Sequence, residues 1–249
     1  MNTNESRTLP GQATQKGSDA QATVAVRLVL VVIILVALWG FVSGQWARPL
    51  PWVFLGVYVI VGLIVPALAV KMDQEFLEDR TQIKEGVQKW DKPIVIVGSL
   101  YVPLGLVLMA ALDARFGWTL SPEGINPIPV WVQIVAIALS ALGYLFSVWA
   151  SAANKFYARF VRIQEDRGHT VVDRGPYRYV RHPGYAGLIL FLLASAPALG
   201  SLWTLIPSGL FLVALVIRTA LEDRFLQGKL DGYKEYARRT RYRLIPGIW

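Results

Sequence analysis

The chain has 249 residues, of which 54% are hydrophobic and 17% are charged, and its formal net charge is +8. Because soluble domains carry about 25% charged residues, this composition argues against a soluble globular protein, a disordered chain and a coiled coil. The absence of cysteine excludes disulfides, thiolate metal sites and cysteine nucleophiles, and two histidines, His169 and His182, are too few for a histidine-rich metal centre.

Long apolar runs predict an all-α fold, a polytopic transmembrane bundle of about six spans. A helix that crosses a bilayer needs about 20 mainly apolar residues. The fifth run is the shortest because Pro197 interrupts it, so we expect a tilted helix in a tight hairpin with the sixth, joined at Gly200-Ser201. The six runs are residues 23–42, 49–70, 93–112, 129–153, 183–199 and 202–221.

The segments between these runs differ in charge. Residues 44–48 and 113–128 hold one basic residue each, whereas residues 71–92 hold five, residues 154–182 hold seven and residues 218–249 hold eight. Basic loops mark the cytoplasmic side. The pattern therefore predicts an integral membrane protein with both termini in the cytoplasm, and it accounts for the positive net charge without nucleic acid as a partner.

Three parts follow from this reading. Residues 1–22 are rich in polar residues and predict a disordered cytoplasmic tail. Residues 23–153 form a four-helix region with a cytoplasmic loop at 71–92, and Arg27 within it has no acidic neighbour four residues away, which favours a snorkelling side chain. Residues 154–249 hold the last hairpin, its flanking loops and a C-terminal interfacial helix.

The entrance to the fifth helix is the first candidate site. In Arg181-His182-Pro183, the proline suits the first turn of a helix, so His182 is expected at a helix N-terminus, where free amides favour an anion. Gly184 and Gly187 permit close approach. Tyr177, Tyr179 and Tyr185 offer flat faces for a purine or a sulfonium cation, although tyrosines of this kind also anchor helices among lipid headgroups.

Arg218 is the second candidate, because it follows sixteen uncharged residues, 202–217. An ionisable residue at the edge of a membrane helix pairs, lines a cavity or snorkels to water. Glu222 lies one turn further on the same face, with Asp223 beside it. An arginine holds a carboxylate, and the two acids suit the amine of an amino-acid-like cofactor. Tyr233, Tyr236 and the arginines of 238–243 favour an interfacial helix on anionic lipid.

Together these motifs resemble the isoprenylcysteine carboxyl methyltransferase family of integral-membrane methyltransferases. The resemblance covers residues 155–249, and one departure is Asp223, where the family has a second glutamate. The motifs that carry the resemblance are His169…Gly175-Pro176-Tyr177, Arg181-His182-Pro183-x-Tyr185-x-Gly187, Arg218…Glu222-Asp223, Tyr233-x-x-Tyr236 and Arg243…Pro246.

The resemblance implies S-adenosylmethionine as the cofactor and a lipophilic acceptor, with no metal. In this family pattern Arg218 and Glu222 are catalytic, with Arg218 orienting the acceptor. The expected cofactor-binding residues are Gln164, His169, Tyr177, Tyr179, His182, Pro183, Tyr185, Gly187, Glu222 and Asp223. The first two helices and the 71–92 loop resemble a bacterial-type extension, which implies a bacterial inner membrane with the site facing the cytoplasm.

Two other functions remain open from the sequence. The Arg-His-Pro segment and the ending at Pro246 are also similar to membrane sterol reductases, which use NADPH. A non-catalytic membrane protein is the third possibility. The set of Arg218, Glu222 and Asp223 favours methyl transfer, and the carboxylate of an isoprenoid- or lipid-like molecule is the expected acceptor.

Overall fold

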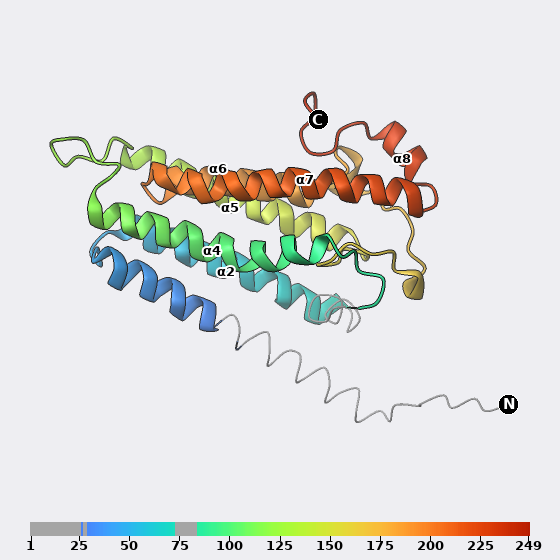
Figure 1. The fold of residues 1–249 in the computed structure, drawn as a ribbon, viewed down its shortest axis with the longest axis horizontal. Helices are drawn as coiled ribbons and strands as arrows, with labels where there is room; N and C mark the ends of the chain where they lie inside the picture. Colours follow the sequence, from blue (N-terminus) through green and yellow to red (C-terminus); the bar gives the residue numbers. More distant parts are fainter. Residues whose placement is uncertain (1–25, 27–28, 73–83) are drawn as a thin grey trace.

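The protein is an all-helical bundle in a computed structural model that describes residues 26, 29–72 and 84–249. The predicted tail at 1–22 and the snorkelling Arg27 lie outside the described residues. The helices run roughly side by side along the long axis of the molecule (Figure 1). In chain order they are the helix Val29–Val42, which ends in the π-helical turn η1 (Leu38–Val42), then α2 (Pro49–Met72), α4 (Asp91–Phe116), α5 (Val130–Ala153), η2 (Glu165–Arg167), η3 (Gly175–Arg178), α6 (Pro183–Ala198), η4 (Leu202–Thr204), α7 (Leu205–Lys229) and α8 (Tyr233–Arg239).

Each apolar run of the sequence folds as a helix over its described residues. Three of the helical segments, Asp91–Phe116, Val130–Ala153 and Leu202–Lys229, are long and apolar enough to cross a membrane among the residues that the structure describes. The apolar helices Val29–Val42, Pro49–Leu63 and Pro183–Ala198 are shorter. The all-helical fold is therefore confirmed, while six spans and the orientation of the termini stay predictions.

Helices α5 and α6 make the most extensive contact among the described helices. A Cβ atom placed on Gly187 would lie 2.4 Å from the carbonyl oxygen of Gly143, and one placed on Gly143 would lie 2.7 Å from the carbonyl oxygen of Gly187. Small residues allow membrane helices to approach in this way. The contact fixes α6, and with it the position of His182 at the N-terminus of that helix.

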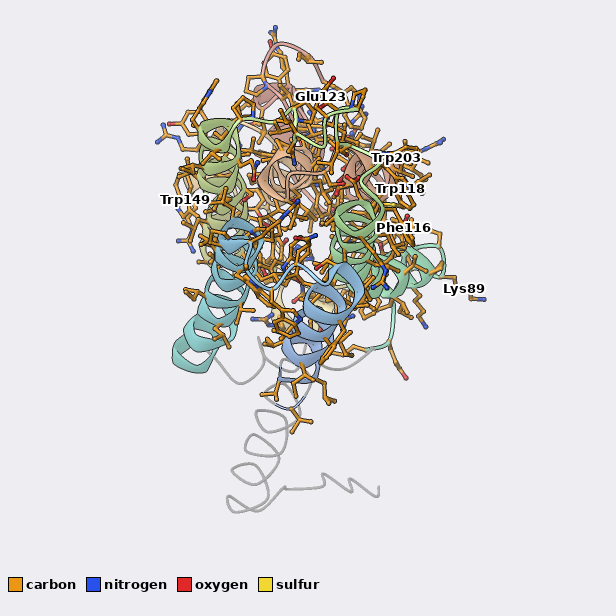
Figure 2. All side chains as sticks on the ribbon, turned by 90° about the vertical axis from the view of Figure 1, so that its left-hand side faces the viewer. Lys89, Phe116, Trp118, Glu123, Trp149 and Trp203 are labelled. Atoms are coloured by element: carbon orange, nitrogen blue, oxygen red, sulfur yellow. The ribbon has the colours of Figure 1, made fainter. Side chains whose placement is uncertain are left out.

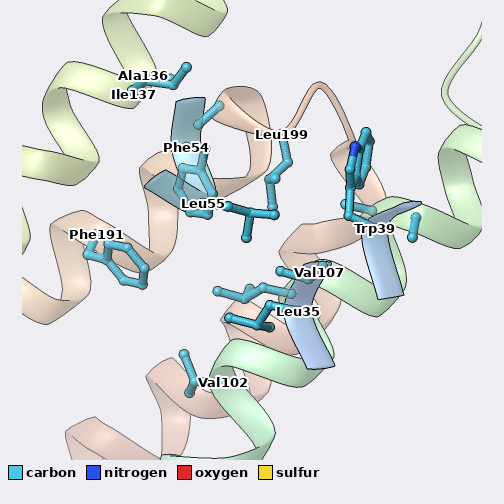
Figure 3. Close-up of a cluster of buried hydrophobic side chains, with 14 of the residues drawn as sticks. Leu35, Trp39, Phe54, Leu55, Val102, Val107, Ala136, Ile137, Phe191 and Leu199 are labelled. Atoms are coloured by element: carbon cyan, nitrogen blue, oxygen red, sulfur yellow. The ribbon is translucent and has the colours of Figure 1, made fainter. Parts of the chain in front are cut away.

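The main core cluster joins five helices around large apolar side chains (Figure 3). Trp39 and Leu35 of the first helix are each 1% exposed and pack with residues of α4 such as Val107. Phe54 of α2 stacks against Phe191 of α6, with ring centroids 6.0 Å apart. The N-terminal helices thus form one packed body with the hairpin α6–α7.

One end of the bundle is closed by the loop 117–129 and η4. Phe116, Trp118 and Trp203 gather on this end (Figure 2), where Trp118 stacks on Phe116 and meets Trp203 edge-on. The buried carboxylate of Asp113 accepts hydrogen bonds from the backbone N–H and the hydroxyl of Thr119, which ties the loop to α4. Tryptophan is enriched at membrane interfaces, so this end suits a headgroup region.

The opposite end of the bundle carries the segment 154–182, α8 and the C-terminal residues, and α4 begins there as well (Figure 1). The N–H groups of Arg181 and His182 donate to the carbonyls of Tyr242 and Arg243 at 2.9 Å each. The hydroxyl of Tyr236 donates to the carbonyl of Tyr177. Loops that flank the hairpin on both sides are therefore bonded into one polar cap.

Candidate active site

Two adjoining cavities lie at the polar end. The aromatic cavity, about 90 Å³, is enclosed by residues 154–185 together with residues of α7 and α8. The helix cavity, about 430 Å³, lies between α2, α4, α5, α6 and α7. Tyr157, Ala158 and Tyr185 line both cavities and so form the wall that separates them.

Aromatic and polar side chains from distant parts of the chain enclose the aromatic cavity. Six residues predicted to bind a cofactor line it: Gln164, His169, Tyr177, His182, Tyr185 and Glu222. Burial raises the pKa of the Tyr177, Tyr233 and Tyr236 hydroxyls. These phenols therefore stay protonated at neutral pH and act as hydrogen-bond donors.

Gln164 holds the shape of the loop that covers the cavity. Its side-chain amide donates to the carbonyl of Phe156 at 2.6 Å, and its side-chain oxygen accepts from Arg167 at 2.9 Å. The Gln164 backbone N–H donates to Nδ1 of His169 at 3.3 Å. Burial and the nearby cations Arg162 and Arg167 lower the pKa of His169 to about 4. His169 is accordingly neutral at pH 7, with Nδ1 as the acceptor.

His182, Tyr185 and Glu222 meet at the wall between the cavities. The rings of His182 and Tyr185 stack with centroids 5.7 Å apart and planes 2° from parallel. The Tyr185 hydroxyl donates to Oε2 of Glu222 at 2.6 Å. His182 Nε2 is buried and makes no close hydrogen bond, and Oδ1 of Asp223 lies 3.5 Å from it. A buried polar atom without a partner is costly, so this nitrogen suits a bound ligand.

Asp223 belongs to the scaffold rather than to the lining of the cavity. It is fully buried and accepts hydrogen bonds from Arg181 at 2.7 and 3.1 Å, from Arg243 at 2.8 Å and from the Tyr233 hydroxyl at 3.1 Å. These bonds join α7, the entrance to α6, α8 and the C-terminal segment around one carboxylate. Two guanidinium groups already bond to the oxygens of Asp223, which gives it a scaffold role, and its contact with a cofactor stays a prediction.

Arg218 pairs with an acid far from it in the sequence. Its Nε donates to Oδ1 of Asp91 at 2.7 Å and its Nη2 to Oδ2 at 3.3 Å, while Nη2 also donates to the carbonyl of Arg159 at 2.9 Å. The guanidinium carbon lies 5.2 Å from the centre of the Tyr185 ring. Arg218 lines the helix cavity and Glu222 lines the aromatic cavity, so the two predicted catalytic residues face different sides of the wall.

Besides Asp223, three further predicted cofactor residues lie outside the cavity lining. Tyr179 is 66% exposed and points away from the core. Pro183 is the buried first residue of α6, and Gly187 is occupied by its contact with α5. Pro183 and Gly187 therefore set the position of α6 through the backbone: Pro183 begins the helix, and Gly187 allows α5 to approach it.

Sequence reasoning missed several residues of the site. Asp91, Arg181, Arg243 and Tyr157 join Arg218, Asp223 and the wall between the cavities. Arg181 and Arg243 stood within the motifs already quoted, so their place in those motifs was the available signal. Asp91 gave none, since its partner lies 127 residues further along the chain.

Comparisons with known proteins relate this chain to integral-membrane methyltransferases. Residues 131–231 match the family model described as phospholipid methyltransferase. The chain is 29% identical over 111 residues to the protein-S-isoprenylcysteine O-methyltransferase of Schizosaccharomyces pombe, covering 43% of this chain and 47% of that protein. These matches confirm the resemblance to the isoprenylcysteine carboxyl methyltransferase family.

A second relative carries a different name. The chain is 28% identical over 147 residues to the cobalt-zinc-cadmium resistance protein CzcN of Cupriavidus metallidurans, covering 58% of this chain and 61% of that protein. The chain thus spans about half to three-fifths of the length of these curated relatives. Among the described residues, no group of three or more His, Asp or Glu side chains is placed to hold a metal ion.

Proposed function

We propose that the protein transfers a methyl group from S-adenosylmethionine to a lipophilic acceptor at the cytoplasmic face of a bacterial inner membrane. The observation that carries this proposal is the pair of adjoining cavities that share Tyr157 and Tyr185, one lined by aromatic and polar groups and the other lying between apolar helices. A polar cofactor and an oily acceptor would meet at that shared wall.

The residues of the aromatic cavity fit the cofactor by their chemistry. Tyrosine and phenylalanine faces suit an adenine ring and a sulfonium cation. Glu222 suits an ammonium group, and Nε2 of His182, which lies 3.5 Å from Asp223 and makes no closer hydrogen bond, suits a polar atom of the ligand. Because the cavity is narrow, about 90 Å³, a ligand of nucleoside size requires its lining to move outward, as in complexes that rearrange on binding.

The chain's own residues supply alignment and exclusion of water. When bound, S-adenosylmethionine supplies a methyl group on a positively charged sulfur. Arg218 would hold the acceptor in the helix cavity, and we propose a carboxylate acceptor, which is ionised at neutral pH and requires no general base. Alignment of two reactants is worth about 7–11 kcal/mol of barrier. The packed helices around the cavity keep water from the reacting pair.

Binding of S-adenosylhomocysteine to the purified protein is the first test. We expect a rise in melting temperature with S-adenosylhomocysteine and none with NADPH, while the reverse result would favour the reductase alternative. Loss of the charged contact at Glu222 is expected to weaken S-adenosylhomocysteine binding by about 10- to 100-fold in Glu222→Ala. Glu235→Ala is the matched control, since Glu235 is exposed on α8 and lines neither cavity.

Methyl transfer itself is tested with membranes that contain the protein and methyl-labelled S-adenosylmethionine. Mass spectrometry of the lipid fraction should show a labelled product with the wild type and with Glu235→Ala, and little with Glu222→Ala. The product's mass and hydrolysis by base distinguish a methyl ester from a methylated amine. The absence of any labelled product from the wild type across lipid extracts would contradict the proposed function.

A further inference from the structure

Asp91 is a fully buried acid in a part of the chain that the family match does not cover. It is the first residue of α4, it is 0% exposed, and it lies outside the residues that match the methyltransferase family. Burying a carboxylate is costly unless charge and hydrogen bonds compensate for it. Here both oxygens bond to Arg218, and Oδ2 also accepts from the N–H of Val161 at 2.7 Å.

The geometry around Arg218 leaves one nitrogen for a ligand. Nε and Nη2 are committed to Asp91 and to the carbonyl of Arg159, whereas Nη1 has no hydrogen-bond partner among the described residues. A guanidinium that donates through two nitrogens to one carboxylate has its plane fixed. The direction of the remaining nitrogen is therefore determined by Asp91.

The bonds of Asp91 to Arg218 and Val161 also connect both cavities. Val161 lines the aromatic cavity, Arg159 lines the helix cavity, and Arg218 lies 5.2 Å from the Tyr185 ring that separates them. Through Asp91, the N-terminus of α4 is joined to the 154–164 segment and to α7. The placement of the acceptor-facing guanidinium relative to the cofactor side thus depends on one carboxylate contributed by α4.

We propose that Asp91 is a positioning residue for methyl transfer, which acts by fixing the plane of the Arg218 guanidinium at the wall between the cavities. This proposal rests on the proposed function. Misplacement of a reacting partner by about 1 Å costs on the order of 100-fold in rate. Asp91→Asn should lower kcat by about that factor, while the dissociation constant for S-adenosylhomocysteine changes by less than about threefold, since neither Asp91 nor Arg218 lines the aromatic cavity.

Asp113→Asn is the matched control. Asp113 lies on the same helix, is 3% exposed and holds the loop at the far end through Thr119. A loss of stability from a buried carboxylate would affect both variants, but only Asp91→Asn should lower kcat. Equal loss of kcat in the two variants would reduce Asp91 to a structural residue and overturn the proposal.

A double-mutant cycle with Arg218→Lys separates positioning from general destabilisation. If Asp91 acts through Arg218, Asp91→Asn in the Arg218→Lys background should lower kcat by less than about threefold further, because coupled residues are not additive. If the double variant instead lowers kcat by the product of the two single effects, the proposal is contradicted. If Asp91→Asn does not accumulate, Asp91→Glu keeps the charge and displaces the guanidinium; an unchanged kcat in that variant would equally overturn it. An inactive wild type would instead count against the proposed function alone.

Discussion

At the scale of single residues, the site depends on which partner each charged group has. Spacing of four along a helix points from Arg218 to Glu222, yet the structure bonds Arg218 to Asp91 and Glu222 to Tyr185. Local spacing indicates which residues share a helix face, but it does not identify a partner on another helix. This is why His182 at a helix start was predictable from Pro183, while the Asp91 contact was not.

Asp223→Ala should be among the most damaging substitutions in the protein. It removes the single acceptor shared by Arg181 and Arg243 and leaves two guanidinium groups without it. Breaking a buried pair in this way costs about 3–5 kcal/mol. Thermal unfolding in detergent should show a large fall in melting temperature, whereas Asp231→Ala, at an exposed position beyond α7, should leave it unchanged. Similar melting temperatures for the two variants would contradict the role of Asp223 as the acceptor shared by Arg181 and Arg243.

His169 provides a prediction about pH. Its pKa is lowered to about 4 in the fold, compared with about 6.5 in an unfolded chain, so the unfolded state binds more protons between these values. The part of the folding stability that is linked to His169 is therefore fully present above pH 6.5 and declines as the pH falls towards 4. Imidazole resonances in NMR, assigned with His169→Gln, should titrate near pH 4. Titration near 6.5 would show that His169 is not packed under the loop as described.

At the scale of helices, the approach of α5 and α6 sets the position of the candidate site. Gly187→Ala would place a methyl group 2.4 Å from the Gly143 carbonyl oxygen and 2.8 Å from the Ser147 nitrogen. Overpacking of this kind costs about 1–3 kcal/mol, and we expect a lower melting temperature and weaker S-adenosylhomocysteine binding. Gly209→Ala on α7 has open space around it and should be neutral in both measurements.

The existence of the helices was largely predictable, because apolar runs of sufficient length dominate the sequence. Their ends were less so. The sixth apolar run ends at Leu221, and α7 continues beyond it to Lys229, where Glu222 bonds to Tyr185 and Asp223 bonds to Arg181 and Arg243. Tertiary partners thus extend a helix beyond its apolar part.

At the scale of the whole molecule, the two ends of the bundle have different roles. The loop 117–129 is predicted to face away from the cytoplasm and α8 to face it, and the natural absence of cysteine makes labelling simple. In whole cells, a membrane-impermeant maleimide should label Glu123→Cys but should label Lys234→Cys only after lysis. The opposite pattern would reverse the predicted orientation.

A structure of the protein with bound S-adenosylhomocysteine tests the two-cavity site most directly. We expect the ligand to open the aromatic cavity, to contact His182 and Glu222, and to direct its sulfur toward the wall at Tyr157 and Tyr185, with Arg218 still held by Asp91 on the other side. A ligand bound elsewhere on the chain, with the wall intact and its sulfur remote from the helix cavity, would contradict the two-cavity site.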